Sequence, residues 1–356
     1  MLKKCLFIHK DYMSNTGGAV ISERNLALCR ATFGKDNVFE FPISKQEKIQ
    51  TLIGLIKGNM EGLNKIINND INKIIISEKI NYVFIDTSIF GLLAKNIKKE
   101  FPEINVIVFF HNFECMYFKE LIKITGKKRH YITLKAAEKN ENAAIEFADN
   151  IITLNERDSQ LLKNYFGRGA DFLLPTSFPD KFDENKLIAD DISEIKLLFV
   201  GSLFFPNEEG VRWFIKEVMP ELDNKYKLYV VGKNFENIKN ELENERIQII
   251  GTVDNLEDWY YNSDAVISPI FSGGGMKTKI AEALMYGKTI VGTKEAFEGY
   301  IKDNRAMIEC NTDEEFIFSL NTINNVGFNN ISREIFINNY SNESLLLKFK
   351  KIFINT

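Results

Sequence analysis

Three glycines, two lysines and a glutamate stand close together in the stretch SPIFSGGGMKTKIAEALMYGKTIVGT, residues 268–293. Consecutive glycines at 273–275 let the backbone approach a ligand closely and adopt positive φ. The pattern that follows predicts a helix that begins near Lys277. Its first amides, with Lys277 and Lys279 beside them, form a site for a diphosphate. Glu282 lies one turn further on, where a carboxylate can accept hydrogen bonds from a ribose diol.

This stretch allows two other interpretations. The glycines could form only a flexible turn, with Glu282 a solvated helix residue. The tripeptide GKT at 287–289 is similar to the end of a phosphate-binding P-loop, but the required leading glycine is Glu282 and the helix precedes GKT instead of following it. We therefore exclude the P-loop and interpret Gly287 as the end of the helix.

A histidine at the end of an apolar run is the second candidate for chemistry. His111 closes VIVFFH and opens HNFE, so it should project from the carboxyl edge of a sheet, where open α/β sheets bind ligands. A structural histidine is the alternative, and we prefer that interpretation for His9. The sequence has no DxD motif, and His9, His111 and His130 lack metal-ligand spacing. No catalytic metal is expected.

Two further turns allow more than one interpretation. Gly17 and Gly18 follow the first apolar run and precede an apolar helix, so they are either a close approach to a ligand or a plain strand-to-helix turn. Asn155 and Glu156, in TLNERD, are either the edge of a binding cleft or a helix-capping turn.

The elements that must position these residues alternate between short apolar runs and longer helical patterns, which predicts parallel sheets covered on both faces. The first series of runs is CLFIH at 5–9, YVFID at 82–86, NVIVFFH at 105–111 and NIITLN at 150–155. The second is KLLFVG at 196–201, KLYVVG at 227–232, IQIIG at 247–251, AVISP at 265–269 and TIVGT at 289–293. Two doubly wound α/β domains are predicted.

Composition shifts give the domain boundaries. We expect an N-terminal domain over 1–175, a polar and acidic linker over 176–194, and a C-terminal domain over 195–332. Helical spacing of Leu345, Leu346, Phe349 and Phe353 predicts an amphipathic terminal helix within 333–356. The length of 356 residues agrees with two domains, because one core usually stops growing at roughly 250 to 300 residues.

Composition also excludes several classes of protein. Hydrophobic residues make up 45% and charged residues 26%, which argues against long disorder, and the net charge of −4 gives no overall attraction to nucleic acid. The four cysteines show no CxxC spacing, so neither zinc nor disulfides are indicated and a reducing cytosol fits best. We find neither a signal-peptide core nor the roughly 18 uninterrupted apolar residues of a membrane span. A cytoplasmic protein is expected.

One local patch is strongly basic. Residues 119–139, KELIKITGKKRHYITLKAAEK, carry seven lysines and arginines against two glutamates. A solvated loop and helix face is one interpretation. The other is a peripheral contact with the inner face of the cell membrane, where anionic lipid attracts each basic residue by about 1 kcal/mol and a lipid-linked glycan could be collected.

Three segments resemble the donor site of retaining GT-B glycosyltransferases. They are KTKIAEALMYGKTIVGT, FVGSLFFPNEEGVRWFIKEVMP at 199–220 and IIGTVDNLEDWYYNSDAVISP at 249–269. This is the family of glycosyl transferases group 1, which includes bacterial mannosyltransferases and sucrose synthase. The resemblance implies the GT-B fold: two Rossmann-like, doubly wound domains facing a central cleft. It also implies donor binding mainly in the second domain and a last helix that returns to the first.

The resemblance assigns roles to individual positions. Glu282 is similar to the family residue that holds the donor ribose, and Thr252 and Val253 stand where the backbone meets the nucleotide base. Gly201 and Ser202, after the first strand of the donor domain, would line the same cleft. In the other domain, the pair Gly17 and Gly18 would face the donor phosphates and the acceptor.

The sequence departs from the family pattern at two places. Gly274 replaces the first glutamate of the E-x7-E motif, and LFFPNEEG lacks the usual basic residue. Recognition of the hexose and the phosphates is therefore expected from the backbone amides of Gly274, Gly275, Met276 and Lys277, and from the lysines. Lys279 and His111 are the candidate catalytic residues, Lys279 by neutralising the leaving diphosphate and His111 by contacting the transferred sugar or the acceptor.

The activity implied is transfer of a hexose from a UDP- or GDP-linked donor to a glycan or glycolipid acceptor, without a metal or another cofactor, in cell-surface polysaccharide synthesis. Retention of configuration implies attack from the leaving-group face, with the departing phosphate helping to deprotonate the acceptor. Two alternatives stay open: a GT-B nucleotide-sugar epimerase, and a non-catalytic partner subunit, which Gly274 suggests.

Overall fold

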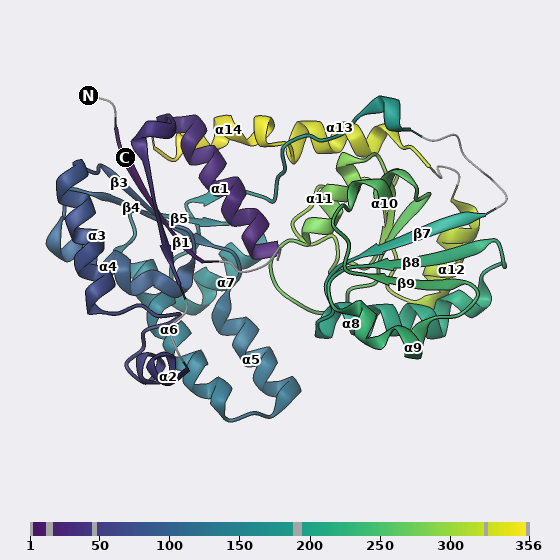
Figure 1. Ribbon diagram of the computed structural model, residues 1–356, viewed down its shortest axis with the longest axis horizontal. Coiled ribbons are helices and arrows are strands. Elements are labelled where there is room, and N and C mark those ends of the chain that lie inside the picture. Colours follow the sequence, from purple (N-terminus) through teal and green to yellow (C-terminus); the bar gives the residue numbers. More distant parts are fainter. Residues whose placement is uncertain (1–2, 12–16, 45–47, 188–193, 324–326, 354–356) are drawn as a thin grey trace. The chain divides into compact units, whose positions relative to one another are not determined.

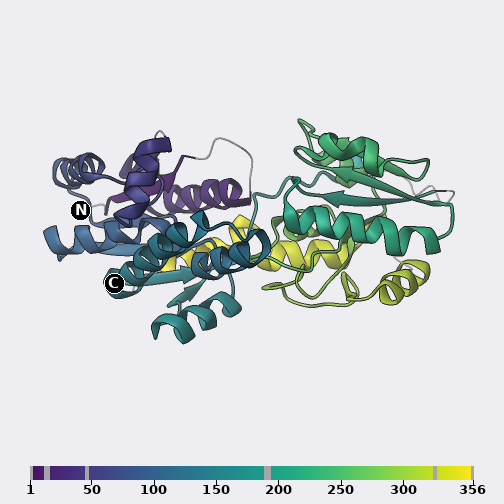
Figure 2. The same ribbon diagram turned by 90° about the horizontal axis from the view of Figure 1, so that it is seen from below.

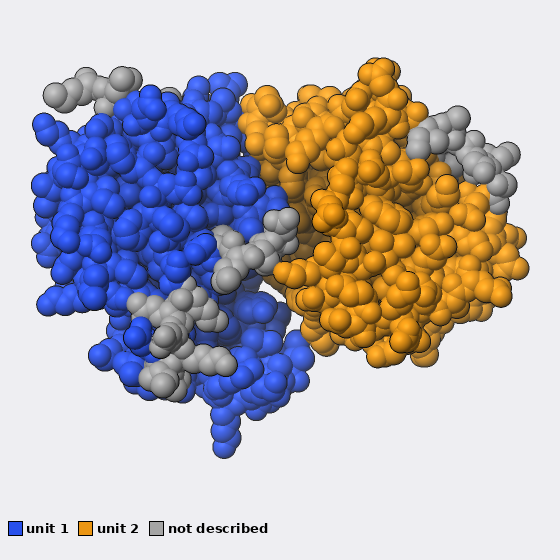
Figure 3. Space-filling model, viewed as in Figure 1, with its two compact units in different colours: residues 1–175, 345–356 blue, residues 176–344 orange. Residues whose placement is uncertain are grey.

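The computed structural model describes residues 3–11, 17–44, 48–187, 194–323 and 327–353. The chain divides into two compact units (Figure 3). Unit 1 contains residues 1–175 and 345–356, and unit 2 contains residues 176–344. In each unit, helices flank a six-stranded parallel sheet (Figures 1 and 2). The α/β fold class predicted from the sequence is confirmed.

The sheet of unit 1 has the strand order β2-β1-β3-β4-β5-β6, and all five neighbouring pairs are parallel. The strands are β1 (Cys5–Lys10), β2 (Val38–Ile43), β3 (Tyr82–Ile85), β4 (Asn105–Phe110), β5 (Asn150–Thr153) and β6 (Phe172–Leu173). The helices are α1 (Gly17–Phe33), α2 (Lys48–Ile56), α3 (Lys65–Glu78), α4 (Gly91–Glu100), α5 (Glu114–Thr125), α6 (Arg129–Phe147) and α7 (Glu156–Phe166).

The sheet of unit 2 has the order β12-β11-β10-β7-β8-β9 and is also parallel throughout. Its strands are β7 (Ile195–Val200), β8 (Tyr226–Val231), β9 (Ile247–Gly251), β10 (Ala265–Ser268), β11 (Thr289–Gly292) and β12 (Met307–Glu309). The helices are α8 (Phe205–Trp213), α9 (Lys239–Leu242), α10 (Glu257–Tyr261), α11 (Thr278–Met285), α12 (Asp313–Thr322) and α13 (Asn330–Asn339).

The strand order locates the ligand-binding edge of each sheet. In unit 1 the order reverses between β1 and β3, and in unit 2 it reverses between β7 and β10. Ligands of open α/β sheets bind at the carboxyl ends of the strands at such a switch point. Residues that follow β1, β3, β7 and β10 are therefore placed for binding.

All nine apolar runs identified in the sequence form strands, since a strand buried on both faces must be apolar throughout. The strands β2, β6 and β12 were not predicted. All three lie at an edge of their sheet. In β2, VFEFPI, most side chains are partly exposed and Pro42 interrupts the pattern, as is typical of an edge strand.

The segment after β6 packs on unit 2. Asp180 forms an ion pair with Arg333 at 2.8 Å, Phe182 stacks on Phe328, and Lys186 pairs with Glu257 at 2.7 Å. The rest of the expected linker, residues 188–193, lies outside the described residues.

The chain ends in two helices where one was expected. After α13 a new helix, α14 (Asn342–Lys351), begins because Ser341 Oγ accepts a hydrogen bond from the amide of Ser344 at 3.1 Å. The later residues of α14 lie beside α1 (Figure 1). There Phe349 packs on Phe84, and Phe353 contacts Phe33 edge to face. This aromatic contact anchors the chain's last helix on unit 1.

Candidate functional site

The glycine loop leads directly into α11 of unit 2. The helix begins at Thr278 with Lys277 as its N-cap residue, as predicted, and Gly287 follows its end with φ of 64°. Gly273 and Gly275 have φ of 126° and 63°, values that side chains with a Cβ adopt with strain. The glycines are therefore required by the backbone of this loop, and the loop presents the helix N-terminus after β10, at the switch point.

Lys279 is the buried cation of this site. Its side chain is 8% exposed, its Nζ donates to Asn207 Oδ1 at 2.9 Å, and it lies 4.1 Å from the centre of the Phe199 ring. Burial, helped by the charge of Lys277, lowers the pKa of Lys279 to about 7, against the opposing effect of Glu282. Its charge therefore depends on the surroundings near neutral pH.

Lys277 folds back over the glycine loop. Its Nζ forms an ion pair with Glu295 Oε1 at 2.7 Å and also donates to the carbonyl oxygens of Gly274 and Gly275 at 3.4 and 3.3 Å. A diphosphate would have to share Lys277 with Glu295, whereas Lys279 has an uncharged amide as its hydrogen-bond acceptor. The two lysines are thus not equivalent.

Glu282 lies three residues after Lys279, on the same side of α11. Burial raises its pKa to about 7, against the lowering effect of Lys181 and Lys279. A carboxyl group in this state can both accept and donate hydrogen bonds. Such a group is suited to a diol.

Gly201 follows β7 and meets the α11 lysine. A Cβ atom built on Gly201 would lie 2.7 Å from Asn207 Nδ2 and 2.8 Å from Lys279 Nζ, so any side chain there would displace both groups. Asn207, in α8, is 5% exposed, and its Nδ2 donates to the carbonyl oxygen of Ser202 at 2.7 Å. The predicted residues Gly201, Ser202 and Lys279 are therefore brought together around Asn207.

Sequence reasoning missed Asn207. It stands in LFFPNEEG, the segment in which the expected basic residue is absent. An amide at the start of a helix, shortly after a strand-end glycine, is the signal that could have identified it.

Thr252 and Val253 follow β9, which β8 separates from β7. The amide and hydroxyl of Thr252 donate to Glu236 at 3.2 and 2.9 Å. The pKa of Glu236 is lowered first by a hydrogen bond from its own backbone amide and then by the bonds from Thr252, against the raising effect of burial. Thr252 is exposed, and its two hydrogen bonds connect this loop to Glu236. The structure gives no contact between these two residues and the lysine cluster.

His111 lies in unit 1 at the end of β4, as predicted, and is 8% exposed. Its Nε2 lies 2.7 Å from the backbone oxygen of Asp86 and 3.3 Å from Asp86 Oδ2. Asp86, fully buried after β3, was not identified from the sequence. Gly17 and Gly18 are the first residues of α1 in the same unit.

Two alternatives are decided by hydrogen bonds. The side chain of Asn155 accepts from the amide of Asp158 at 2.8 Å and is the N-cap of α7, so the capping interpretation is confirmed. His9 Nδ1 donates to the carbonyl oxygen of Lys10 at 2.9 Å, which fits the structural role expected for it.

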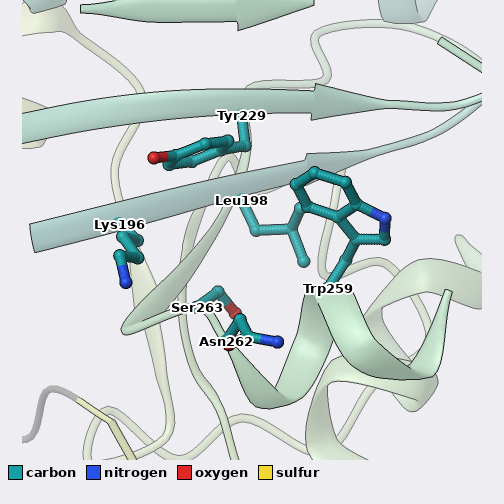
Figure 4. Close-up of a pocket in the computed structure, with 6 residues that line it drawn as sticks. All are labelled: Lys196, Leu198, Tyr229, Trp259, Asn262 and Ser263. Carbon is teal, nitrogen blue, oxygen red and sulfur yellow. The ribbon is translucent and has the colours of Figure 1, made fainter. Parts of the chain in front are cut away.

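A separate pocket of about 140 Å³ lies between β7, β8 and the region of α10 (Figure 4). Lys196, Leu198, Tyr229, Trp259, Asn262 and Ser263 line it. None of these is a candidate site residue. The candidate site is thus defined by its strand ends and by α11, and not by this pocket.

Within the described ranges, no group of three or more His, Cys, Asp or Glu side chains could hold a metal ion. In the same part of the chain, no helix is both long and apolar enough to cross a membrane.

Comparison with known proteins agrees with this geometry. Residues 194–323 match the family model of glycosyl transferases group 1. No curated protein sequence matches the chain. HepE of Anabaena, in complex with UDP, is similar in structure with a TM-score of 0.70 and 12% identity, over 99% of this chain and 100% of HepE. The lipopolysaccharide outer core galactosyltransferase WaaB is similar in structure with a TM-score of 0.65 and 15% identity, over 99% of this chain and 100% of WaaB.

A third similar structure is that of a TarM mutant from S. aureus in complex with Fondaparinux, alpha-GlcNAc-glycerol and UDP. Its TM-score is 0.59 at 15% identity, over 77% of this chain and 55% of TarM. The chain has the GT-B fold, and its second unit carries a group 1 glycosyltransferase domain. The resemblance to GT-B glycosyltransferases inferred from the sequence is confirmed, and the chain is a glycosyltransferase enzyme.

Proposed function

We propose that this chain transfers a hexose from a UDP- or GDP-linked donor to a glycan or glycolipid acceptor, with retention of configuration and without a metal ion. One observation carries the proposal. The group 1 match covers residues 194–323, and within it a buried lysine, Lys279, meets the strand-end glycine Gly201 at the switch point of the sheet. A cation there, beside a helix N-terminus, fits a diphosphate.

Each group of the site then has a defined task. The amides of Gly274 to Lys277 and the ammonium groups of Lys277 and Lys279 bind the diphosphate. Glu282 accepts hydrogen bonds from the ribose, and the backbone of Thr252 and Val253 borders the base. As the sugar bond breaks, negative charge grows on the leaving phosphate, and preorganised donors in a water-poor site stabilise it strongly.

The nucleotide and the sugar are suggested by similar proteins. HepE was crystallised with UDP and with UDP-glucose, and WaaB is described as a galactosyltransferase. UDP-linked hexoses are therefore the first donors to test, and GDP-linked sugars are the second. His111, in unit 1, is proposed to contact the transferred sugar or the acceptor.

The acceptor is proposed to be a glycan or glycolipid of the cell surface, collected by a cytoplasmic enzyme that can rest on the inner face of the membrane. The helices α5 and α6 support this contact. Ile124 near the end of α5, and Tyr131 and Ile132 near the start of α6, are exposed. Exposed basic residues lie around these apolar groups, namely Lys123, Lys127, Lys128, Arg129 and Lys135.

Sedimentation with liposomes tests the membrane contact. Binding should require anionic lipid, fall as salt is added, and weaken when Lys127, Lys128 and Arg129 are changed to Ser. If nothing sediments with anionic vesicles at low salt, the acceptor is collected from solution and the basic segment is a solvated face.

Calorimetry with two ligands tests the diphosphate site. UDP and uridine, and GDP and guanosine, are titrated into the wild type and a variant with Lys277→Ala and Lys279→Ala. Each lost hydrogen bond to a charged group costs roughly 1.5 to 3 kcal/mol, so diphosphate affinity should fall at least tenfold while nucleoside affinity changes little.

Lys216→Ala is the matched control, because Lys216 is an exposed lysine of the same unit whose one ion-pair partner among the described residues is its neighbour Glu217. It should leave both affinities unchanged. Equal losses for diphosphate and nucleoside in the double variant would show that the lysines have no phosphate role.

A further inference from the structure

A second buried polar cluster lies in unit 1, formed by Arg24, Asn25, Asp86 and His111. Arg24 and Asn25 belong to α1, Asp86 follows β3, and His111 follows β4. The four residues are at most 8% exposed. Since α1 follows β1, and the strand order of this sheet reverses between β1 and β3, the cluster lies at the switch point of unit 1.

The carboxylate of Asp86 is occupied by neighbours other than Arg24. Asn25 Nδ2 donates to Asp86 Oδ1 at 2.5 Å, and His111 Nε2 lies 3.3 Å from Oδ2. Burial lowers the pKa of Arg24, against the raising effect of the charge of Asp86. Among the described residues, neither Asp86 nor another carboxylate forms an ion pair with the guanidinium of Arg24.

Among the described residues, only one of the three guanidinium nitrogens of Arg24 has a hydrogen-bond partner. Its Nη1 donates to the backbone oxygen of Pro175 at 3.0 Å, and its guanidinium lies 5.7 Å from the centre of the Phe109 ring. Nε and Nη2 are buried and have no hydrogen-bond partner among the described residues. Burial lowers the pKa of Arg24 to about 9. A buried cation with unsatisfied N–H groups is costly unless something accepts from them.

The two free nitrogens are the right pair for one kind of ligand. In a planar guanidinium, the Nε–H and one Nη–H point the same way along one edge, which matches the two oxygens of a carboxylate or phosphate. Nη1, the nitrogen bound to Pro175, is on the other side. We infer that the Nε–Nη2 edge of Arg24 binds an oxyanion of a substrate, a phosphate or a carboxylate.

The neighbour of Arg24 across Phe109 adds a second requirement. The His111 ring lies 5.0 Å from the Phe109 ring, and its Nε2 donates to the backbone oxygen of Asp86. In the neutral tautomer that fits this bond, Nδ1 is the acceptor, and it is buried without a partner among the described residues. A ligand with an anionic group for Arg24 and a hydroxyl group for His111 satisfies both, as a phosphorylated or acidic sugar would.

Two molecules could supply this oxyanion: an anionic acceptor, or the diphosphate of the donor. That Arg24 binds an oxyanion does not depend on the proposed function. The assignment of that oxyanion to donor or acceptor does rest on it. The experiment therefore measures the two sources separately.

The variant for the test is Arg24→Met, which keeps the length of the side chain and removes its charge and donors. Arg30→Met is the matched control, since Arg30 lies in the same helix and pairs with Glu40 at 2.9 Å. Inorganic phosphate is titrated by calorimetry into the full chain, with UDP or GDP present at saturation to fill the site in unit 2. UDP and GDP are titrated alone in a second arm.

For an acceptor oxyanion, we expect phosphate to bind the wild type in the presence of nucleotide. Arg24→Met should then lower the affinity for phosphate at least tenfold, equal to about 1.4 kcal/mol, and change the affinity for the nucleotide by less than twofold. For a donor oxyanion, nucleotide affinity itself should fall at least tenfold. Arg30→Met should change neither. If no nucleotide binds the wild type at all, the proposed function fails, and phosphate titration without nucleotide still tests Arg24.

Unchanged phosphate and nucleotide affinities in folded Arg24→Met overturn the inference. A lowered melting temperature with those unchanged affinities makes Arg24 a structural tie to Pro175 instead. If Arg24→Met does not fold, Arg24→Lys is measured, because it keeps the charge but loses the two-nitrogen edge. Arg24→Lys should lower the affinity for the same oxyanion several-fold, and an unchanged affinity would likewise overturn the inference.

Discussion

The affinity for a nucleoside diphosphate should fall as the pH rises above 7, because Lys279 loses its proton. Burial brings the pKa of Lys279 to about 7 in the free protein, so its amino group is mostly protonated and charged at pH 6 and mostly neutral at pH 8. Only the charged form attracts the diphosphate. A pKa lowered by burial thus predicts tight binding on the acid side and weak binding on the basic side.

The size of the effect follows from the pKa of Lys279 in the complex. A hydrogen bond to a charged group contributes roughly 1.5 to 3 kcal/mol, and one pKa unit corresponds to about 1.4 kcal/mol. Bound diphosphate should therefore raise the pKa of Lys279 by about one to two units. Between the two pKa values the affinity falls about tenfold per pH unit, and the total loss is about 10- to 100-fold.

The assay is calorimetry with UDP or GDP from pH 7 to pH 9.5, a range above the last phosphate ionisation near pH 6. Lys279→Met should bind weakly with a flat profile. Glu282, whose pKa is also raised to about 7, ionises over the same range, so Glu282→Gln is measured as well and should keep the slope. Constant wild-type affinity from pH 7 to 9, or an equal slope in Lys279→Met, refutes this reasoning.

Three other outcomes are expected. Glu282→Ala should keep the fold and lose roughly 1.5 to 3 kcal/mol of nucleotide binding, and unchanged affinity in calorimetry would remove Glu282 from the ribose site. His111→Ala should lower turnover by up to about tenfold with little change in nucleotide affinity, and full turnover would make this histidine structural. Buried Glu141 accepts from the amides of Glu114 and Cys115, and burial raises its pKa to about 8, above its unfolded value. Folding favours the protonated form, so Glu141 should lower the unfolding free energy by up to about 1.4 kcal/mol per pH unit from about pH 5 to 8, and denaturant titrations of Glu141→Gln should give a slope smaller by this contribution.

Local patterns in the sequence were sufficient for most of the fold. A short run rich in Val, Ile and Phe, such as NVIVFFH, predicts a strand covered on both faces, and the glycines at 273–275 indicated the loop and the start of α11. The edge strand β2 could not be recognised in the same way, because VFEFPI is partly exposed and contains a proline. Edge strands have no second covered side, so their sequence is not forced to be apolar.

The site was only partly predictable, because its contacts join residues that are far apart in the chain. Gly201 and Lys279 were identified from motifs, but Asn207, which touches both, has no distinctive spacing. Asp86 beside His111 is a similar case: an aspartate at a strand end is common, and only the folded sheet pairs it with the histidine. The ion pair of Lys277 with Glu295 also appears only in the structure.

The most direct test of the account is release of nucleoside diphosphate from a panel of UDP- and GDP-linked hexoses by the purified chain. We predict that the wild type releases it from at least one donor, slowly by hydrolysis alone and faster with a glycan or glycolipid acceptor. The variant with Lys277→Ala and Lys279→Ala should release little. A change of the sugar without release would indicate an epimerase. Binding without either reaction would indicate a non-catalytic subunit, and no binding of any nucleotide sugar would contradict the account.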